Sequence, residues 1–350
     1  MEVNRIDDDG VWNYALKQSP KSQLLQSWEW GIFQQTLRRK VHHLQLVEDG
    51  TVLALLQCFE HTLAAGKRYL YAPRGPVVLV DDPLLFDSIV HHFTRALQEL
   101  AKSSGAVFVR IEPSGSSQLT AQSFVSLDYR SVPSVQPGNE LFVRVNHEEP
   151  KLLAAMHEKT RYNIRLALKR GVRTRLIEEF GYARRAFPAF WKLIESTAER
   201  QNIKTHDRSY YERMLEVLMP KGVVKMLVAE FENEIICANL LGVFGDTVTY
   251  LHGGSSYEHR ALMAPYLLHW EGIRITQQSG LRYYNLGGIS PEGAVNDKWE
   301  NLTHFKQGFV TLGETGEHVT YIGGLDLVTR PLWYRMYGTA KKIKKMLHRR

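Results

Sequence analysis

The sequence predicts an α/β (α+β) protein built from two similar domains in tandem. A chain of 350 residues with 44% apolar residues suits two cores better than one. The same order of elements is also expected twice: a hairpin, a strand, a tight corner, a long helix, Ser-Gly and a final strand. Residues 1–145 are expected to form the first domain and 146–318 the second, with 319–350 packing back on the first.

The later copy lies between Lys225 and Ser290. Alternation of apolar and polar residues with period 2 indicates strands, and spacing near 3.6 indicates a helix. The predicted elements are a hairpin of Met226–Glu230 and Ile235–Val243, a strand Thr247–Leu251, a helix Tyr257–Gln278 and a strand Arg282–Leu286.

The earlier copy repeats this order. An Asp49-Gly50 turn between two apolar alternations is typical of a hairpin. Pro83 stands at the expected start of a helix, and proline is favoured in the first turn of a helix. The predicted elements are a hairpin of His43–Val47 and Val52–Phe59, a strand Tyr69–Tyr71, a helix Pro83–Lys102 and a strand Val107–Ile111.

The residues outside the two copies are predicted to be mainly helical. Ser27 is a plausible N-cap for the second of two helices within residues 8–40. A loop is expected over Ser131–Glu140. Further helices are expected at Met156–Arg170, Phe187–Glu199, Asp207–Leu218 and from Pro331 to the C-terminus.

Composition limits the classes of function. The net charge of +7 favours an anionic partner but does not identify it. A basic surface that binds no specific ligand would explain the charge nearly as well. Cys58 and Cys237 lie in apolar runs and are expected to be buried thiols in a reducing compartment. Neither an apolar signal segment nor an apolar run of 18 residues is present, so a cytoplasmic location is expected.

The chain carries none of the common motifs for nucleophilic, metal or nucleotide chemistry. Gly-x-Ser-x-Gly, Cys-x-x-Cys, His-Glu-x-x-His and the phosphate-binding Gly-x-x-x-x-Gly-Lys-Ser/Thr are all missing. The pairs His42-His43 and His91-His92 lack the spacing of metal ligands. We therefore expect no metal and no cofactor.

The corner before the long helix is a natural anion site, because unpaired backbone N–H groups point out of the first helical turn. Acyl-CoA N-acyltransferases with this strand order place a Gln/Arg-x-x-Gly-x-Gly/Ala loop there to wrap pyrophosphate. This chain instead has Arg260-Ala-Leu-Met263-Ala264-Pro265, without the glycines. A different acyl donor is therefore expected.

Six motifs occur in order along the chain and together carry a resemblance. They are Tyr71-Ala-Pro-Arg-Gly-Pro76, Lys159-Thr-Arg-Tyr-Asn-Ile-Arg165, Thr197-Ala-Glu-Arg200, Tyr250-Leu-His-Gly-Gly-Ser-Ser256, Ala264-Pro-Tyr-Leu-Leu-His-Trp270 and Phe305-Lys306. The sequence resembles the FemABX family of peptidoglycan bridge-forming aminoacyltransferases over residues 20–335. The resemblance implies two GNAT-like domains. The sequence has no heptad-patterned insertion, so the coiled-coil arm of some family members is not expected.

The resemblance also implies an activity. Such enzymes move an aminoacyl group from aminoacyl-tRNA to the side-chain amine of the third residue of a peptidoglycan stem. The acceptor is lipid II or its UDP-linked precursor. Some members bind the nucleotide phosphates with a lysine where this chain has Gln34, which favours a lipid-linked acceptor.

Two site residues carried over by the resemblance are expected to be catalytic. Lys306 is the candidate that stabilises the tetrahedral oxyanion, since an ordered cation does this best in a site of low dielectric. A surface lysine on a strand is the alternative. Phe305 is expected to stack on the terminal adenosine of tRNA, and a core phenylalanine is the alternative.

Four further residues are expected to bind substrate. Arg200 would hold a phosphate, or form a helix-end salt bridge. Tyr250 would line the acceptor groove, or be a buried structural tyrosine. Glu112 would position the acceptor amine, or pair with a neighbouring arginine. Arg74 belongs to the first quoted motif. The reaction is expected where the two copies meet.

Two basic segments suggest partners. Without a coiled-coil arm, the helix Lys159–Arg170 is expected to contact tRNA. The last thirteen residues carry Lys341, Lys342, Lys344, Lys345, Arg349 and Arg350 beside an apolar edge, which suits an anionic membrane surface or a solvated helix end. Two other functions remain open: N-acyl transfer from coenzyme A or another small donor, and a binding protein that has lost the reaction.

Overall fold

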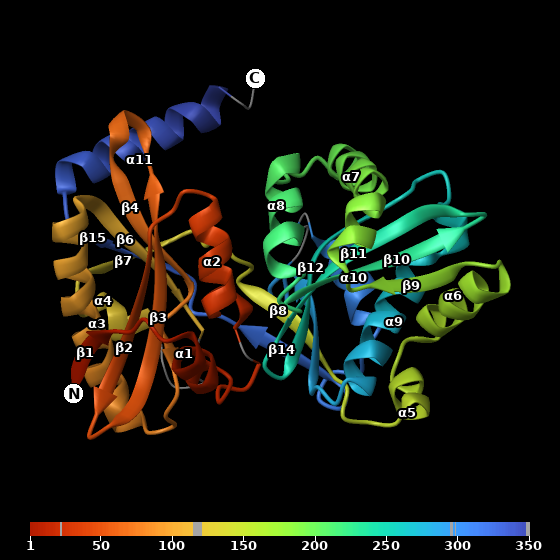
Figure 1. Cartoon of the computed structure of the whole chain (residues 1–350), viewed down its shortest axis with the longest axis horizontal. Helices are drawn as coiled ribbons and strands as arrows, with labels where there is room; N and C mark the ends of the chain where they lie inside the picture. Colours follow the sequence, from red (N-terminus) through yellow and green to blue (C-terminus); the bar gives the residue numbers. More distant parts are fainter. Residues whose placement is uncertain (22, 115–120, 295–296, 298, 348–350) are drawn as a thin grey trace. The chain divides into compact units, whose positions relative to one another are not determined.

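A computed structural model describes residues 1–21, 23–114, 121–294, 297 and 299–347. The chain divides into two compact units, each with its own sheet (Figure 1). Unit 1 comprises Met1–Ser19, Leu25–Gly138 and Tyr321–Arg350, and unit 2 comprises Pro20–Leu24 and Asn139–Thr320.

Unit 1 is built on a sheet in the order β1-β2-β3-β4-β6-β15-β7, with the short β5 (Val77–Val78) pairing with β3. The strands are β1 (Glu2–Arg5), β2 (Val41–Glu48), β3 (Thr51–Thr62), β4 (Arg68–Arg74), β6 (Ala106–Pro113), β15 (Gly324–Val328) and β7 (Tyr129–Val132).

Unit 2 is built on a seven-stranded sheet in the order β14-β8-β13-β12-β11-β10-β9. The strands are β14 (Gly316–Thr320), β8 (Asn139–Arg144), β13 (Tyr283–Gly288), β12 (Thr247–Ser255), β11 (Glu234–Phe244), β10 (Val224–Phe231) and β9 (Arg173–Ile177).

The two sheets have the same construction. Each contains one parallel pair among antiparallel neighbours, β4 with β6 in unit 1 and β12 with β13 in unit 2. One long helix connects the strands of each pair, as a parallel connection requires. The predicted tandem GNAT-like duplication is therefore confirmed.

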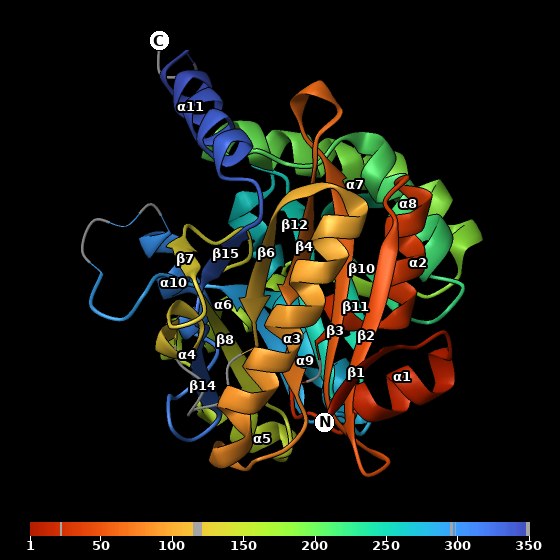
Figure 2. The same ribbon diagram turned by 90° about the vertical axis from the view of Figure 1, so that its left-hand side faces the viewer.

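Helix α3 (Pro83–Ser104) crosses one face of the sheet of unit 1 and buries Phe86, Phe93 and Leu97 in its core (Figure 2). Its N-cap Asp82 accepts a hydrogen bond from the amide of Leu84, and Gly105 ends it with a φ of 68°. On the other face lie α1 (Asp9–Leu16) and α2 (Trp28–Thr36), and Ser27 caps α2 as predicted. The remaining helices of unit 1 are α4 (Ala121–Val125) and α11 (Pro331–Leu347).

Helices cover both faces of the sheet of unit 2 (Figure 1). One face carries α6 (Glu158–Lys169) and α9 (Ala264–Gln278), and the other carries α7 (Phe180–Gln201) and α8 (Arg208–Leu218). The shorter helices are α5 (Glu149–Ala154) and α10 (Glu300–Gln307).

Three predictions about local structure were wrong. The helix expected from Tyr257 begins only at Ala264, because Met263 has a φ of 57° and Pro265 stands in the first turn. The loop expected over Ser131–Glu140 contributes its ends to β7 and β8. The main segment of unit 2 also begins at Asn139 and not at residue 146, because β8 pairs with β13 and β14.

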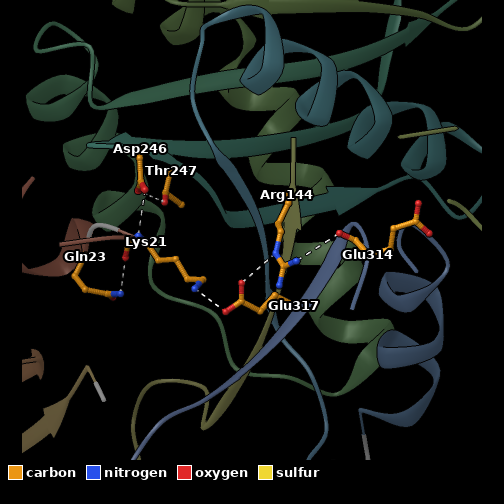
Figure 3. A network of polar contacts seen from close by, with 7 residues as sticks. All are labelled: Lys21, Gln23, Arg144, Asp246, Thr247, Glu314 and Glu317. Atoms are coloured by element: carbon orange, nitrogen blue, oxygen red, sulfur yellow. Dashed lines mark hydrogen bonds and ion pairs between the residues drawn. The ribbon is translucent and has the colours of Figure 1, made fainter. Parts of the chain in front are cut away.

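Polar contacts attach the segment Pro20–Leu24 to unit 2 (Figure 3). The Nζ of Lys21 lies 2.6 Å from Oε1 of Glu317, and Glu317 also pairs with Arg144 at 3.4 Å. The backbone amide of Lys21 donates to Asp246 at 3.3 Å. Ion pairs with exposed members contribute little individually, so this network fixes the position of the segment more than it stabilises the fold.

Both cysteines are buried thiols, and burial raises the pKa of each to about 12. Cys58 lies on β3 and Cys237 on β11, as predicted. Among the helices of the described residues, none has both the length and the apolar composition needed to cross a membrane.

Candidate active site

The site is the place where β12 and β13 separate. The two strands pair in parallel only from Thr247 with Tyr283 to Thr249 with Asn285, although β12 continues to Ser255. A bulge in the pairing of β11 with β12 at Leu240 and Leu241 accompanies the separation. The first residue of β12 beyond the paired region is Tyr250.

Lys306 reaches this gap from α10. Only 3% of the residue is exposed, and its Nζ donates a hydrogen bond to the carbonyl oxygen of Gly288 at 2.6 Å. Burial lowers the pKa of Lys306 to about 8, and the negative charge of Glu140 limits this decrease. The side chain is therefore still mostly protonated at neutral pH, as a buried cation. The alternative of a surface lysine on a strand is wrong, since Lys306 is buried and helical.

Gly287 allows the backbone to approach Lys306 closely. It has a φ of 78°, which favours glycine, and a Cβ there would lie 3.6 Å from Nζ of Lys306 and 3.5 Å from the carbonyl oxygen of Tyr250. The Asn285 side chain holds this turn, accepting from the amide of Gly287 at 2.7 Å and donating to Glu140 at 2.9 Å. The ammonium group of Lys306 and the carboxylate of Glu140 are thus both connected to the turn at Gly287.

One aromatic ring lies beside the ammonium group, and others pack against that ring. The Nζ of Lys306 lies 5.9 Å from the centre of the Tyr250 ring, within cation–π range. The ring of His269 lies edge-on to Tyr250 at 4.8 Å and to Phe305 at 5.5 Å. Burial, with the nearby charge of Lys306, lowers the pKa of His269 to about 3. His269 is therefore neutral at pH 7, and Lys306 carries the positive charge of this cluster.

Tyr250 also lines a cavity of about 250 Å³ in unit 2. Burial raises the pKa of Tyr250, so its hydroxyl stays protonated. The cavity is bounded by side chains of α7, α8 and β12 and of the segment between α7 and α8. Those with polar groups are Thr197, Lys204, Thr205, His206, Tyr211, Tyr250 and His252. Donors, a cation and aromatic surfaces suit an anionic or hydroxyl-rich ligand.

Arg200 lies near this cavity but is exposed. Its guanidinium is 3.4 Å from the carbonyl oxygen of Ser255 and 3.4 Å from Oγ1 of Thr197, which lines the cavity. No carboxylate among the described residues forms an ion pair with Arg200, and its expected contact with substrate phosphate stays a prediction.

A second cleft, of about 440 Å³, lies along a different face of α10. Glu300, Thr303, His304 and Gln307 line it, and their spacing places them on one side of the helix. Lys306 lines neither this cleft nor the cavity of about 250 Å³. The ring of Tyr250, which lines the smaller cavity, lies 5.9 Å from Nζ of Lys306 and connects that cavity to the gap between the strands.

Glu112 and Arg74 belong to unit 1, and both are buried. The carboxylate of Glu112 accepts from the amides of Val135 and Gln136 at 2.6 and 2.9 Å and from the hydroxyl of Tyr71 at 3.2 Å. These bonds hold the loop after β7. A direct role of Glu112 toward an acceptor amine stays a prediction.

Arg74 ends β4 with a φ of 56°. Its guanidinium lies 3.4 Å from the centre of the Tyr321 ring and donates to the carbonyl oxygen of Pro137 at 2.8 Å. These contacts stabilise unit 1. Substrate binding by Arg74 also stays a prediction.

The corner before α9 is not shaped like a pyrophosphate loop. Arg260–Leu262 form a single 3-10 turn, Met263 has a positive φ, and Pro265 removes one backbone donor. The guanidinium of Arg170 also donates to the carbonyl oxygen of Ala261. These observations agree with the expectation that the chain uses a donor other than coenzyme A.

Sequence reasoning missed three residues of the site: His269, Glu140 and Asn285. His269 lies within the quoted motif Ala264–Trp270, so its position could have been noted. Glu140 and Asn285 come together only through the pairing of β8 with β13, which no local pattern reveals.

Comparison with known proteins agrees with this geometry. The FemAB family matches residues 11–132, 121–233 and 220–342. A UDP-N-acetylmuramoylpentapeptide-lysine N(6)-alanyltransferase of Weissella viridescens is 23% identical over 347 residues, which is 95% of this chain and 97% of the relative. A lipid II:glycine glycyltransferase of Staphylococcus saprophyticus is 23% identical over 252 residues, covering 69% of this chain and 58% of the relative. The chain thus spans less than two thirds of the second relative.

Solved structures show the same fold. The crystal structure of FemX superimposes with a TM-score of 0.81 at 18% identity, over 96% of this chain and 99% of that one. A tandem GNAT protein from the clavulanic acid biosynthesis pathway gives a TM-score of 0.55 at 12% identity, over 94% and 98% of the two chains. The family match covers nearly the whole chain, so this protein belongs to the FemAB family and is an aminoacyltransferase.

Proposed function

We propose that the protein transfers an amino acid from aminoacyl-tRNA to the side-chain amine of the third residue of a peptidoglycan stem peptide, building an interpeptide bridge. The observation that carries the proposal is the buried ammonium group of Lys306 at the gap between β12 and β13. The names of the relatives support it, since one is a lysine N(6)-alanyltransferase and another a lipid II:glycine glycyltransferase.

The proposed reaction is the aminolysis of an ester. The acceptor nitrogen attacks the ester carbonyl carbon, a C–N bond forms, and the carbonyl oxygen becomes an oxyanion. The C–O bond to the ribose then breaks, and the ribose oxygen leaves with the proton lost by the attacking amine. Lys306 stabilises the oxyanion, and removing one such donor typically costs about 10²–10³ in kcat.

The surroundings of Lys306 suit this role. Exclusion of water strengthens the field of the ammonium group, and the hydrogen bond to Gly288 fixes its position before any substrate arrives. His269, neutral at pH 7, adds no competing charge. A substrate group serves as the general base in this proposal.

The two substrates are assigned to different parts of unit 2. The acceptor occupies the cavity beside Tyr250, and Phe305 stacks on the terminal adenosine of the tRNA. The basic helix α6 contacts the tRNA backbone through side chains on its solvent side, and Lys159, Arg165 and Lys169 are all exposed. The acceptor is lipid II or its UDP-linked precursor, and the reaction takes place in the cytoplasm.

The test supplies purified protein with a panel of aminoacyl-tRNAs and with lipid II containing lysine or diaminopimelate. Mass spectrometry of the stem peptide reports whether a residue has been added and which one. We expect addition from one or a few tRNAs, abolished by RNase treatment before the reaction. Addition that persists after RNase would refute tRNA dependence and select a small acyl donor. Inactivity with every donor and both acceptors would favour a binding protein.

A further inference from the structure

One side of helix α11 is packed onto unit 1. The hydroxyl of Tyr334 donates to Asp326 of β15 at 2.8 Å. The rings of Tyr334 and Tyr337 lie 5.3 and 5.2 Å from the ring of Phe108 on β6. These contacts fix the rotation of the helix about its axis, and so decide which side chains face outward.

The outward side of α11 carries large apolar residues. Leu332 is 71% exposed, Met336 is 53% exposed and Ile343 is 48% exposed. Their separations of four and seven residues place them on one stripe of the helix. A stripe of exposed apolar side chains on a helix already anchored by its opposite side needs an explanation beyond the fold.

The surroundings of this stripe are basic. From Thr329 to Arg350 the sequence contains no aspartate or glutamate. Arg330, Arg335 and Lys341 are exposed on the described part of this segment. The loop between β3 and β4 adds Lys67, whose Nζ lies 4.3 Å from the centre of the Trp333 ring of α11.

We infer that α11 is a docking surface for an anionic lipid bilayer. Leu332, Met336 and Ile343 would enter the boundary between headgroups and acyl chains, with the helix lying in the plane of the surface. Arg335 would face the phosphates of acidic lipids beside the stripe, and Arg330 and Lys341 would add positive charge close to the membrane surface. Trp333 belongs to the residue type that sits at the level of the headgroups.

Charge favours a bilayer over a second copy of this chain. Two α11 helices meeting through the same stripe would bring their cations together without a compensating carboxylate, which is repulsive. An acidic membrane supplies the missing negative charge over an extended plane. The outcome for activity rests on the proposed function, because docking would hold the protein beside a lipid-linked acceptor.

The test measures co-sedimentation of the full chain with vesicles that contain neither acceptor nor tRNA. One set contains phosphatidylcholine alone and the other contains phosphatidylcholine with 30% phosphatidylglycerol. We expect at least tenfold stronger binding to the acidic vesicles, weakening as the salt concentration rises. The triple variant Leu332→Ser, Met336→Ser, Ile343→Ser should lose at least tenfold in this binding, and the variant Arg335→Glu, Lys341→Glu should lose its preference for acidic lipid.

The matched control is Leu84→Ser, which removes an apolar side chain that is 88% exposed on the same unit. Leu84 lies in the first turn of α3, and the other end of α3 is near Arg330, just before α11. Roughly 30 Å of helix therefore separates Leu84 from the start of α11. This variant should bind the acidic vesicles like the wild type. Circular dichroism and melting temperature should be unchanged in all variants, since the replaced side chains are exposed.

Three outcomes would overturn the inference. They are equal binding to both kinds of vesicle, wild-type binding by the triple variant, and a dimer in sedimentation velocity that the triple variant dissociates. Failure of the proposed function is separable, because lipid II dissolved in detergent needs no docking to a bilayer. If that function is correct, the triple variant should use lipid II in detergent normally and lose activity only on lipid II in acidic vesicles.

Discussion

The ammonium nitrogen of Lys306 lies 2.6 Å from the carbonyl oxygen of Gly288, at the place where the parallel pairing of β12 and β13 has ended. Gly288 is the last residue of β13, so the lysine is fixed by the sheet although it belongs to a helix. A cation held by the backbone is preorganised, and preorganisation makes a charge effective in catalysis.

Replacement of Lys306 by methionine should separate activity from stability. We expect aminoacyl transfer to fall about 10²–10³-fold in kcat, because the donor to the oxyanion is lost. A pKa lowered from 10.5 to about 8 means that burying the charge costs roughly 3 kcal/mol at neutral pH. Loss of the bond to Gly288 costs about 1 kcal/mol in return. The free energy of unfolding in urea should therefore be unchanged or higher by up to about 2 kcal/mol.

A suitable control is His304→Ala, because His304 is exposed on the same helix. It should leave both activity and stability near those of the wild type. Full activity of Lys306→Met would remove the assignment of this lysine.

The contribution of Lys306 should depend on pH in one direction. Its pKa of about 8 means that the ammonium form is lost as pH rises through 8. The acceptor amine becomes more reactive over the same range, so the total rate is not a clean measure. The ratio of the wild-type rate to that of Lys306→Met cancels the acceptor and should fall from pH 7 to pH 9. A ratio that rises would show that the neutral lysine is the active form.

The stability of the protein should change with pH for the same reason. Between pH 8 and 10.5 the unfolded chain holds a proton on Lys306 that the folded chain has lost, so this residue makes stability rise with pH there. The comparison of urea unfolding for the wild type and Lys306→Met at pH 7.5 and pH 9.5 isolates the effect. The difference in unfolding free energy between them should shrink at the higher pH.

Phe305→Leu should weaken the use of aminoacyl-tRNA more than it weakens the fold. Phe305 is half-buried, with its ring 4.9 Å from Tyr266 and 5.4 Å from Phe309. Stacking on a base is worth about 1–3 kcal/mol, so KM for the tRNA should rise roughly five- to 150-fold. Phe309→Leu is the matched control, because Phe309 is 1% exposed and should lower stability without raising that KM. Equal KM values for the two variants would indicate that Phe305 is only a core residue.

Asp326→Asn should destabilise the protein severely. Asp326 is fully buried and accepts two hydrogen bonds of 2.7 Å from Arg110, which joins β15 to β6. Removing the carboxylate leaves a buried guanidinium without its counter-charge, at a cost of about 3–5 kcal/mol. The double variant Arg110→Met, Asp326→Leu should recover most of this loss in thermal unfolding. A double variant no more stable than Asp326→Asn would show that the pair itself, and not its unpaired member, carries the energy.

Much of the fold could be predicted from local patterns. The two hairpins, the two crossover helices and the cap at Ser27 follow from alternation, turn residues and N-cap chemistry, which act within a few residues. Glu232 and Asn233, for example, adopt the positive φ values of 50° and 65° that a two-residue hairpin turn requires. The start of α9 was missed because Met263 adopts the left-handed conformation, which an apolar side chain does not announce.

The site was less predictable. Lys306, Phe305 and Tyr250 were found through their motifs, and the structure brings these three together in unit 2. Arg74 was found through its motif and Glu112 by its place after the last predicted strand of the first copy, but their observed partners are backbone groups and tyrosines of unit 1. Whether a residue identified from the sequence stabilises the fold or binds a ligand depends on neighbours that are remote in sequence.

Repeated elements, a missing loop motif and six short segments are enough to predict the duplicated α/β arrangement, a donor other than coenzyme A and a resemblance to the FemABX family. The burial of Lys306, the contact of Glu140 with Asn285 next to it, and the outward position of Leu332, Met336 and Ile343 on α11 are known from the tertiary structure alone. The burial of a side chain and the electrostatic field around it depend on all of its neighbours. Strand pairing brings together neighbours that are more than a hundred positions apart, so no short stretch of the sequence reveals them.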